Sequence, residues 1–159
     1  MPMTIDTAGL DEVSRILAQL GARAQDVASA ALYDGAGVVA DAFTAATGQI
    51  RTEPFKGKRE HRLPSPEEAA AVKGKTGIAT FKKNGSEVNT LIGVQPNAGY
   101  VMLGKRKTAV QEIARSINSG TSFMSKQPVF RKAVSSSKAE AMAATVAKAE
   151  EKLNEIIGG

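Results

Sequence analysis

Apolar residues recur at alternating intervals of three and four along the first part of the chain. This spacing is typical of one face of an amphipathic helix. Asp6 or Thr7 can cap the start of the helix, and acidic residues follow in its first turn, where the helix dipole favours negative charge. The sequence therefore predicts a long N-terminal helix, whose stripe comprises Leu10, Val13, Leu17, Leu20, Ala24, Val27 and Ala31.

The same pattern continues toward Ala46 through two glycines, Gly35 and Gly37. Each glycine lowers helix propensity by about 1 kcal/mol relative to alanine, so we expect a kink or close packing at this point. Thr47 and Gly48 are expected to end the helix, because glycine is the usual residue of a left-handed C-terminal cap.

A second helical stripe occupies the last part of the chain. Pro128 sits where a first helical residue is expected, since proline lacks the N–H group that a helix start leaves unbonded. The sequence predicts a long C-terminal helix with the apolar positions Val129, Phe130, Ala133, Val134, Ala141, Thr145, Ala149, Leu153 and Ile156.

The clearest local signal between the two helices is the pair Asn84–Gly85, which separates two strand-like runs. Asn-Gly readily adopts the two positive φ angles of a type I′ turn, so a β-hairpin is expected. With this turn, Lys82 lies opposite Glu87 and Phe81 lies opposite Val88, and both cross-strand pairs are favourable.

Shorter elements are expected on either side of the hairpin. A capped helix is predicted from Ser65 to Lys73, and a strand from Tyr100 to Leu103. Thr108 is expected to cap a further helix that runs through Ile117 and ends by Gly120.

The predicted fold class is α+β, with a small antiparallel β-sheet that includes a β-hairpin, flanked by long N-terminal and C-terminal helices. The order of the strands stays open. At 159 residues the chain fits one domain, residues 1–159.

The composition narrows the classes of function. The chain has no cysteine, which excludes disulfides and thiolate metal sites and fits a protein folded in a reducing cytoplasm. The N-terminus does not have the basic start and apolar run of a secretory signal, and no stretch is apolar enough to span a bilayer, so a soluble protein is expected. The net charge of +5 is compatible with nucleic acid or with an acidic protein partner.

The catalytic and ligand-binding patterns that the sequence suggests are incomplete. His61 stands among charged residues with no nucleophile pattern around it, and one histidine without cysteine makes a zinc site improbable. Gly74, Lys75 and Thr76 resemble the end of a phosphate-binding loop, but Ala69 occupies the position of its first glycine. We therefore expect no enzyme activity, no cofactor and no metal.

The best candidate for a partner surface is a basic loop at about residues 51–66, which mixes prolines with cations and is expected to be long and mobile. An acidic protein or the lumen of a DNA-conducting channel is preferred as its neighbour over sequence-specific DNA reading, because few aromatics accompany the charge. The candidate contacts are Arg51, Lys56, Lys58, Arg59 and Arg62 in this loop, and Lys82, Lys83, Asn84, Gly85 and Glu87 at the hairpin tip, whose edge can accept another strand.

The order of these pieces resembles the tail-completion, or tail-terminator, proteins that join heads and tails in long-tailed bacteriophages. The segment Ala36–Ala40 is similar to the family's Ala-rich helix, and Thr47–Arg51 to its Thr-Gly-x-Leu-Arg segment. Ile92–Val94 is similar to its Gly-Val strand end, followed by Tyr100 and by a Gly-Thr turn at Gly120 and Thr121.

The closing signature of that family is Gln-Pro-Phe-x-x-x-Ala, which residues 127–133 resemble with one inserted residue. The chain departs from the family where an acidic-aromatic pair is replaced by Asn118 and Ser119. The resemblance adds Gly120, Thr121, Pro128, Phe130 and Arg131 to the candidate interface residues.

The resemblance implies a structural subunit at the neck of a virion, made in the host cytoplasm. Such subunits form a ring, commonly hexameric, that caps the tail tube protein, docks to the head connector or head-closure protein, and can lie close to DNA in the channel. Four alternatives remain: a basic nucleic-acid-binding accessory protein, a head-closure protein, a tail-tube subunit, which needs more strands than we find, and a small modifying enzyme.

Overall fold

The computed structural model describes residues 8–55, 61–84, 87–95 and 97–158. In chain order the elements are α1 (Ala8–Thr47), α2 (Pro66–Val72), β1 (Thr76–Ile78), β2 (Lys82–Asn84), β3 (Glu87–Asn89), β4 (Ile92–Val94), β5 (Tyr100–Leu103), β6 (Arg106–Ala109), α3 (Val110–Ser119) and α4 (Val129–Ile157). The predicted α+β class is confirmed, with small two-stranded antiparallel sheets in place of one sheet.

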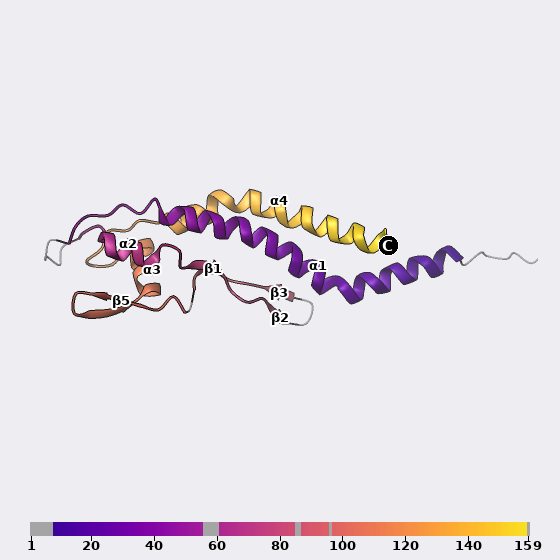
Figure 1. Ribbon diagram of the computed structural model, residues 1–159. Helices are drawn as coiled ribbons and strands as arrows, with labels where there is room; N and C mark the ends of the chain where they lie inside the picture. The colour runs from indigo at the N-terminus through magenta and orange to yellow at the C-terminus, as the bar shows by residue number, and fades with distance from the viewer. Residues whose placement is uncertain (1–7, 56–60, 85–86, 96, 159) are drawn as a thin grey trace, which may run out of the picture.

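The two long helices lie side by side and run in opposite directions, which gives the molecule its elongated shape (Figure 1). Gly35 of α1 faces Ala141 and Thr145 of α4, whereas Phe43 of α1 stacks on Phe130 near the start of α4. With a rise of about 1.5 Å per residue in both helices, α4 ends about level with residue 23 of α1. The N-terminal part of α1 therefore extends past its partner.

Close packing, the second of the two expectations for this segment, occurs at Gly35. A Cβ atom added there would lie 2.0 Å from Thr145 Oγ1 and 2.8 Å from the Ala141 carbonyl oxygen. Gly37 has no atom within 4 Å of such a Cβ. The first glycine is thus needed for contact between the helices and the second is not.

These two glycines should respond in opposite ways to the same substitution. Gly35→Ala should lower the free energy of unfolding by about 1 to 3 kcal/mol, because the added methyl forces α1 and α4 apart. Gly37→Ala should raise it by up to about 1 kcal/mol through helix propensity alone. Urea unfolding followed by circular dichroism measures both, and stabilisation by Gly35→Ala would contradict the packing described.

The end of α1 agrees with the prediction in position but not in geometry. Thr47 is the last helical residue, and its hydroxyl donates to the Thr44 carbonyl oxygen at 2.7 Å. Gly48 does not have a positive φ, so the predicted left-handed cap is wrong. Gly48 and Gln49 instead bond three residues back, to Ala45 and Ala46, which tightens the last turn.

The hairpin is present, but its predicted register is wrong, because each residue of the first strand pairs two residues further along the second strand than predicted. Lys82 pairs with Asn89 rather than with Glu87, and Glu87 pairs with Asn84. No described non-glycine residue has a positive φ, so Asn84 ends a strand and does not form the first corner of a type I′ turn.

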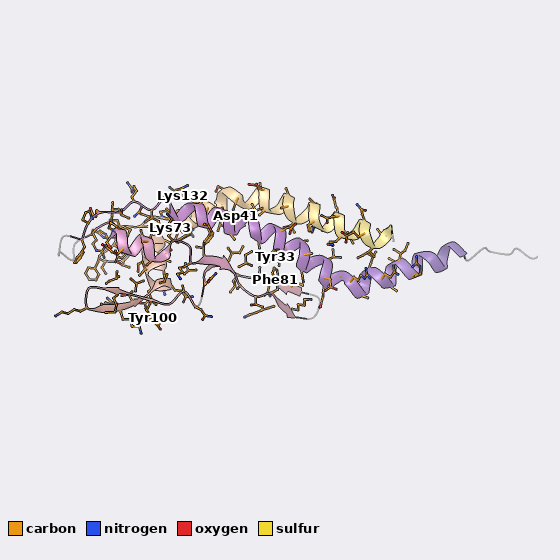
Figure 2. All side chains as sticks on the ribbon, viewed as in Figure 1. Tyr33, Asp41, Lys73, Phe81, Tyr100 and Lys132 are labelled. Carbon is orange, nitrogen blue, oxygen red and sulfur yellow. The ribbon has the colours of Figure 1, made fainter. Side chains whose placement is uncertain are left out.

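Contacts with α1 explain why the turn preference does not decide this register. The Phe81 ring lies 6.0 Å from the Tyr33 ring (Figure 2). The Lys83 Nζ atom lies 3.5 Å from Asp26 Oδ1. Below the tip, β1 pairs with β4 in a second ladder, with Gly77 opposite Gly93. One extra residue on the first strand separates the two ladders, as in a β-bulge.

A second hairpin, β5 with β6, was only half predicted. The Tyr100–Leu103 strand is confirmed, but Thr108 is a strand residue of β6 and not a helix cap, and α3 starts at Val110 without a side-chain cap. Leu103 pairs with Arg106, and Gly104 between them has φ +64°, as the first corner of a type II′ turn requires.

Helix α2 begins as predicted. The Ser65 hydroxyl accepts a hydrogen bond from the Glu68 N–H, and the Glu68 carboxylate accepts one from the Ser65 N–H, which forms a capping box. Pro66 occupies the first helical turn. The C-terminal helix also begins within one residue of the predicted position, at Val129.

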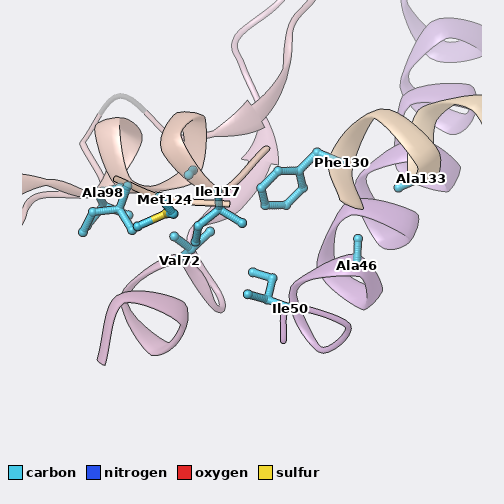
Figure 3. Close-up of a cluster of buried hydrophobic side chains, with 11 residues drawn as sticks. Ala46, Ile50, Val72, Ala98, Ile117, Met124, Phe130 and Ala133 are labelled. Carbon is cyan, nitrogen blue, oxygen red and sulfur yellow. The ribbon is translucent and has the colours of Figure 1, made fainter. Parts of the chain in front are cut away.

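The hydrophobic core lies at one end of the molecule, where α2 and α3 meet the end of α1 and the start of α4 (Figure 3). Ile117, Val72 and Val110 are its most buried side chains. Outside this core, the buried hydrophobic residues of α1 and α4 are mostly alanines. The core comprises Ala46, Ile50, Val72, Ala98, Val110, Ile113, Ala114, Ile117, Met124, Phe130 and Ala133.

The chain exposes more surface than a compact protein of its mass. Its accessible surface is 10939 Å², whereas a compact monomer of 16.6 kDa exposes about 7,600 Å². The excess of about 3,300 Å² is twice the total area of a standard protein interface.

Candidate assembly surface

A groove of about 1110 Å³ lies at the end of the molecule that contains the core. It lies between α2, α3, the β5–β6 hairpin and residues 120–124, and we call it the end groove. Three of its side chains, Phe55, Met102 and Phe123, are apolar and more than half exposed. Such a combination of concave shape and exposed apolar groups is typical of a contact surface.

An ion pair occupies one wall of the end groove. Arg62 Nη1 and Nη2 donate to the two carboxylate oxygens of Glu68 at 2.6 and 2.7 Å, which is the bidentate geometry that makes such pairs strong. The guanidinium group also lies 5.2 Å from the centre of the Phe55 ring. Arg62, predicted as a contact for a partner, is therefore already bound within its own chain.

The ion pair shifts the pKa of both groups. The hydrogen bond to Glu68 is the largest cause that raises the pKa of Arg62. Burial by itself raises the pKa of Glu68, but the hydrogen bonds from Arg62 and Ser65 and the charge of Arg62 outweigh it, so the pKa of Glu68 is lowered. Both shifts favour the charged pair.

The described parts of the basic loop are held by hydrogen bonds, and the mobility expected for the loop stays a prediction. The Glu53 N–H donates to the Pro64 carbonyl oxygen at 3.0 Å, and the Leu63 N–H donates to Glu53 Oε1 at 2.7 Å. The backbone of Arg62 bonds on both sides to residues 123 and 125, in a short parallel bridge. Lys56, Lys58 and Arg59 lie outside the described residues.

The Gly-Thr turn lies beside this bridge, at the rim of the end groove. Gly120 has φ +76°, and an added Cβ would come within 3.3 Å of the backbone of Lys126. Thr121 Oγ1 accepts hydrogen bonds from the N–H groups of Phe123 and Met124. The structure thus brings Arg62, Gly120 and Thr121 together from segments that are far apart in the sequence.

The other candidate residues near the start of α4 make contacts within the chain. Buried Gln127 exchanges two hydrogen bonds of 2.9 Å with the backbone of Arg51. Phe130 lies in the core, so it does not face a partner. Pro128 is half-buried, and the exposed Arg131 donates its N–H to Asn118 Oδ1 at 3.3 Å.

The predicted residues of the first hairpin lie far from the end groove, along α1 (Figure 1). Lys82 and Lys83 are exposed, and Lys83 is paired with Asp26. Asn84 and Glu87 form the last described backbone pair before the turn, and Gly85 lies outside the described residues.

The prediction missed the exposed apolar side chains that the fold creates. On α4, Met142, Val146, Leu153 and Ile157 are exposed, and on α1 Leu17 is 62% exposed. Tyr100 is exposed on β5, with Lys107 Nζ 4.6 Å from its ring centre (Figure 2). The spacing of the α4 residues is visible in the sequence, but only the fold shows which apolar face is left uncovered.

Among the described residues there is no group of three or more His, Asp or Glu side chains that could hold a metal ion. Within the same part of the chain, no helix is long and apolar enough to cross a membrane. His61 is exposed.

Comparison of the chain with protein-family models, with curated proteins and with solved structures finds no match in any of the three.

Proposed function

We propose that this chain is a structural subunit that assembles with other protein chains, and specifically a tail-completion subunit that forms a ring at the neck of a long-tailed bacteriophage. The observation that carries the proposal is the excess of exposed surface described above. A chain of this size gains stability when that surface is covered by a partner. The surface includes large apolar side chains at three places: the end groove, α1 and α4.

The arrangement of the elements supports the specific role. Long first and last helices enclose short antiparallel strands, in the order that the resemblance implies. The resembling segments Thr47–Arg51 and 127–133 also meet in space, through the two bonds of Gln127 to Arg51. The Gln127 N–H donates as well to Ile117 of α3, the helix that ends just before Gly120 and Thr121. Segments that are joined in this way form one structural unit.

Localisation within virions tests this role. A tag would be added after Gly159 in a cell that makes the chain and releases phage particles, and the purified particles would be imaged with a gold-labelled tag ligand. Label at the junction of head and tail is the expected result, because the proposed ring joins the two.

Two other outcomes would replace the proposal. Label along the whole tail would make the chain a tube subunit, and particles without label would exclude a place in the virion. A tag on a known head protein in the same preparation controls for ligand access.

A second candidate function is favoured by one observation. The tip of the β5–β6 hairpin carries three consecutive cations, Lys105, Arg106 and Lys107, all exposed. A two-stranded ribbon of this kind can place cations against the phosphates of nucleic acid. Binding of duplex DNA that falls steeply with salt and is lost on charge reversal at these three positions would support a nucleic-acid-binding accessory protein.

A further inference from the structure

Two apolar stripes on this molecule have the spacing of a coiled-coil seam, and each is uncovered for part of its length. The first, the α1 seam, comprises Leu10, Val13, Leu17, Leu20, Ala24 and Val27, at intervals of three and four. Its continuation lies along α4, where Ala31 and Ala46 are buried and Val38, Ala42 and Phe43 are half-buried. The seam is therefore continuous with an existing helix interface, but α4 ends before covering it.

The second stripe lies on α4. Met142, Val146, Ala149, Leu153 and Ile156 follow one another at intervals of four and three. Ile156 and half-buried Ala149 turn toward α1, whereas Met142 is 60% exposed and Val146 is 54% exposed. With Leu153 and Ile157, these exposed residues form the α4 stripe, which lies within a 60° sector of the helix at about 100° per residue.

The two stripes cannot cover each other within one chain. Val146 lies next to Thr145, opposite Gly35, whereas Leu17 is eighteen residues further along α1. At about 1.5 Å per residue, Leu17 and Val146 are about 25 Å apart along the helix axis. If they meet, they do so between two copies of the chain.

We infer that the α1 seam of one copy packs against the α4 stripe of a second copy. This inference rests on the proposed function, because a contact between two different surfaces of identical chains is heterologous and closes into a ring when the rotation per subunit allows it. The second copy is a fitting occupant for two reasons: both stripes have heptad spacing, and the α1 seam continues the existing α1–α4 interface past the end of α4.

Charge and area agree with this occupant. Arg23 borders the α1 seam between Leu20 and Val27, and Glu150 borders the α4 stripe between Val146 and Leu153. Opposite charges at the flanks of a helical seam favour pairing and set its orientation. The excess surface of about 3,300 Å² is enough for each copy to take part in two such contacts at once, one per stripe.

Disulfide trapping tests the contact, since the chain has no cysteine of its own. The full-length double variant Leu17→Cys, Val146→Cys would be produced with a C-terminal tag in the particle-forming cell described above, and the lysate and purified particles would be oxidised. The 25 Å separation forbids an intrachain disulfide, for which the Cα atoms must approach to about 6 Å. A ladder of disulfide-linked oligomers is expected on a non-reducing gel. Mass spectrometry should identify peptides in which residue 17 is linked to residue 146.

The matched control is Ala22→Cys, Val146→Cys, because Ala22 is exposed and lies about 140° around α1 from Leu17. The test pair should cross-link at least about tenfold faster than the control, because an interface holds two thiols at millimolar effective concentration. Arg23→Glu should slow the cross-linking of the test pair, and Glu150→Arg in the same chain should restore it.

Three outcomes would overturn the inference, and a fourth would overturn only the proposed function. Dimers formed by Leu17→Cys alone would show that α1 pairs with α1, and equal rates for test and control pairs would show random collision. No cross-link in particles that carry the neck label would leave the proposed function standing and remove this interface. A ladder without any label on particles would do the reverse.

Discussion

Replacing Phe130 by alanine should lower the free energy of unfolding by about 4 kcal/mol, the largest effect expected for any single change considered. The ring is 6% exposed. It stacks on Phe43 with 5.1 Å between ring centres and 20° between planes. Its removal leaves a cavity where the two long helices meet the core, and the surrounding backbone can close such a cavity only in part.

Urea unfolding measures this loss, with Phe130→Leu as the control. Leucine keeps most of the buried area but not the stacking, so it should cost about 1.5 kcal/mol or less. A loss below about 1 kcal/mol for alanine would show that Phe130 does not pack as described. In that case its role in the resembling segment 127–133 would have to lie in contacts with a partner.

Replacing Glu68 by alanine should have the second largest effect, a loss of about 3 kcal/mol. The carboxylate is buried, and it satisfies both Arg62 and the N–H of Ser65. Without it, the capping box of α2 is lost and a half-buried guanidinium group has no counter-charge. The wall of the end groove should open as a result.

The neighbouring carboxylate supplies the control for this change. Glu67 is exposed, so Glu67→Ala should leave the urea midpoint almost unchanged. Equal effects at the two positions would contradict the assignment of the ion pair. The loss of stability in Glu68→Gln should lie between those of Glu67→Ala and Glu68→Ala, because the amide keeps the side chain's size and can still accept a hydrogen bond from the Ser65 N–H.

The lowered pKa of Glu68 makes part of its contribution depend on pH. A carboxylate with a lowered folded-state pKa stabilises the fold fully above the pKa of the unfolded chain, about 4.3 for glutamate. This contribution is lost as the pH falls through the lowered value. The difference in stability between the wild-type chain and Glu68→Gln should therefore be constant above about pH 5.5 and shrink below about pH 4.

The ion pair in the wall of the end groove joins two residues that no pattern in the sequence links. In the sequence, Arg62 is one cation of the basic loop, and Glu68 is the second of two adjacent glutamates. In the fold they bind each other, because the capping box aims Glu68 toward the returning loop. Periodicity and turn preferences carry no information on a contact of this kind.

The sequence alone determined the elements whose causes are local. The two long helices follow from apolar stripes of period 3.6, α2 from its capping box, and the existence of the first hairpin from two strand-like runs around a turn. These features depend on residues within one or two turns of each other.

Only the tertiary structure decided the rest. The hairpin register is shifted because Phe81 and Lys83 are held by α1, and Thr108 joins a strand because β5 is there to pair with it. The tertiary structure also decided which apolar stripes stay exposed, because α1 continues about fifteen residues past the end of α4. An apolar stripe predicts that one face of a helix will be buried. Whether the element that covers this face belongs to the same chain depends on where every other element ends.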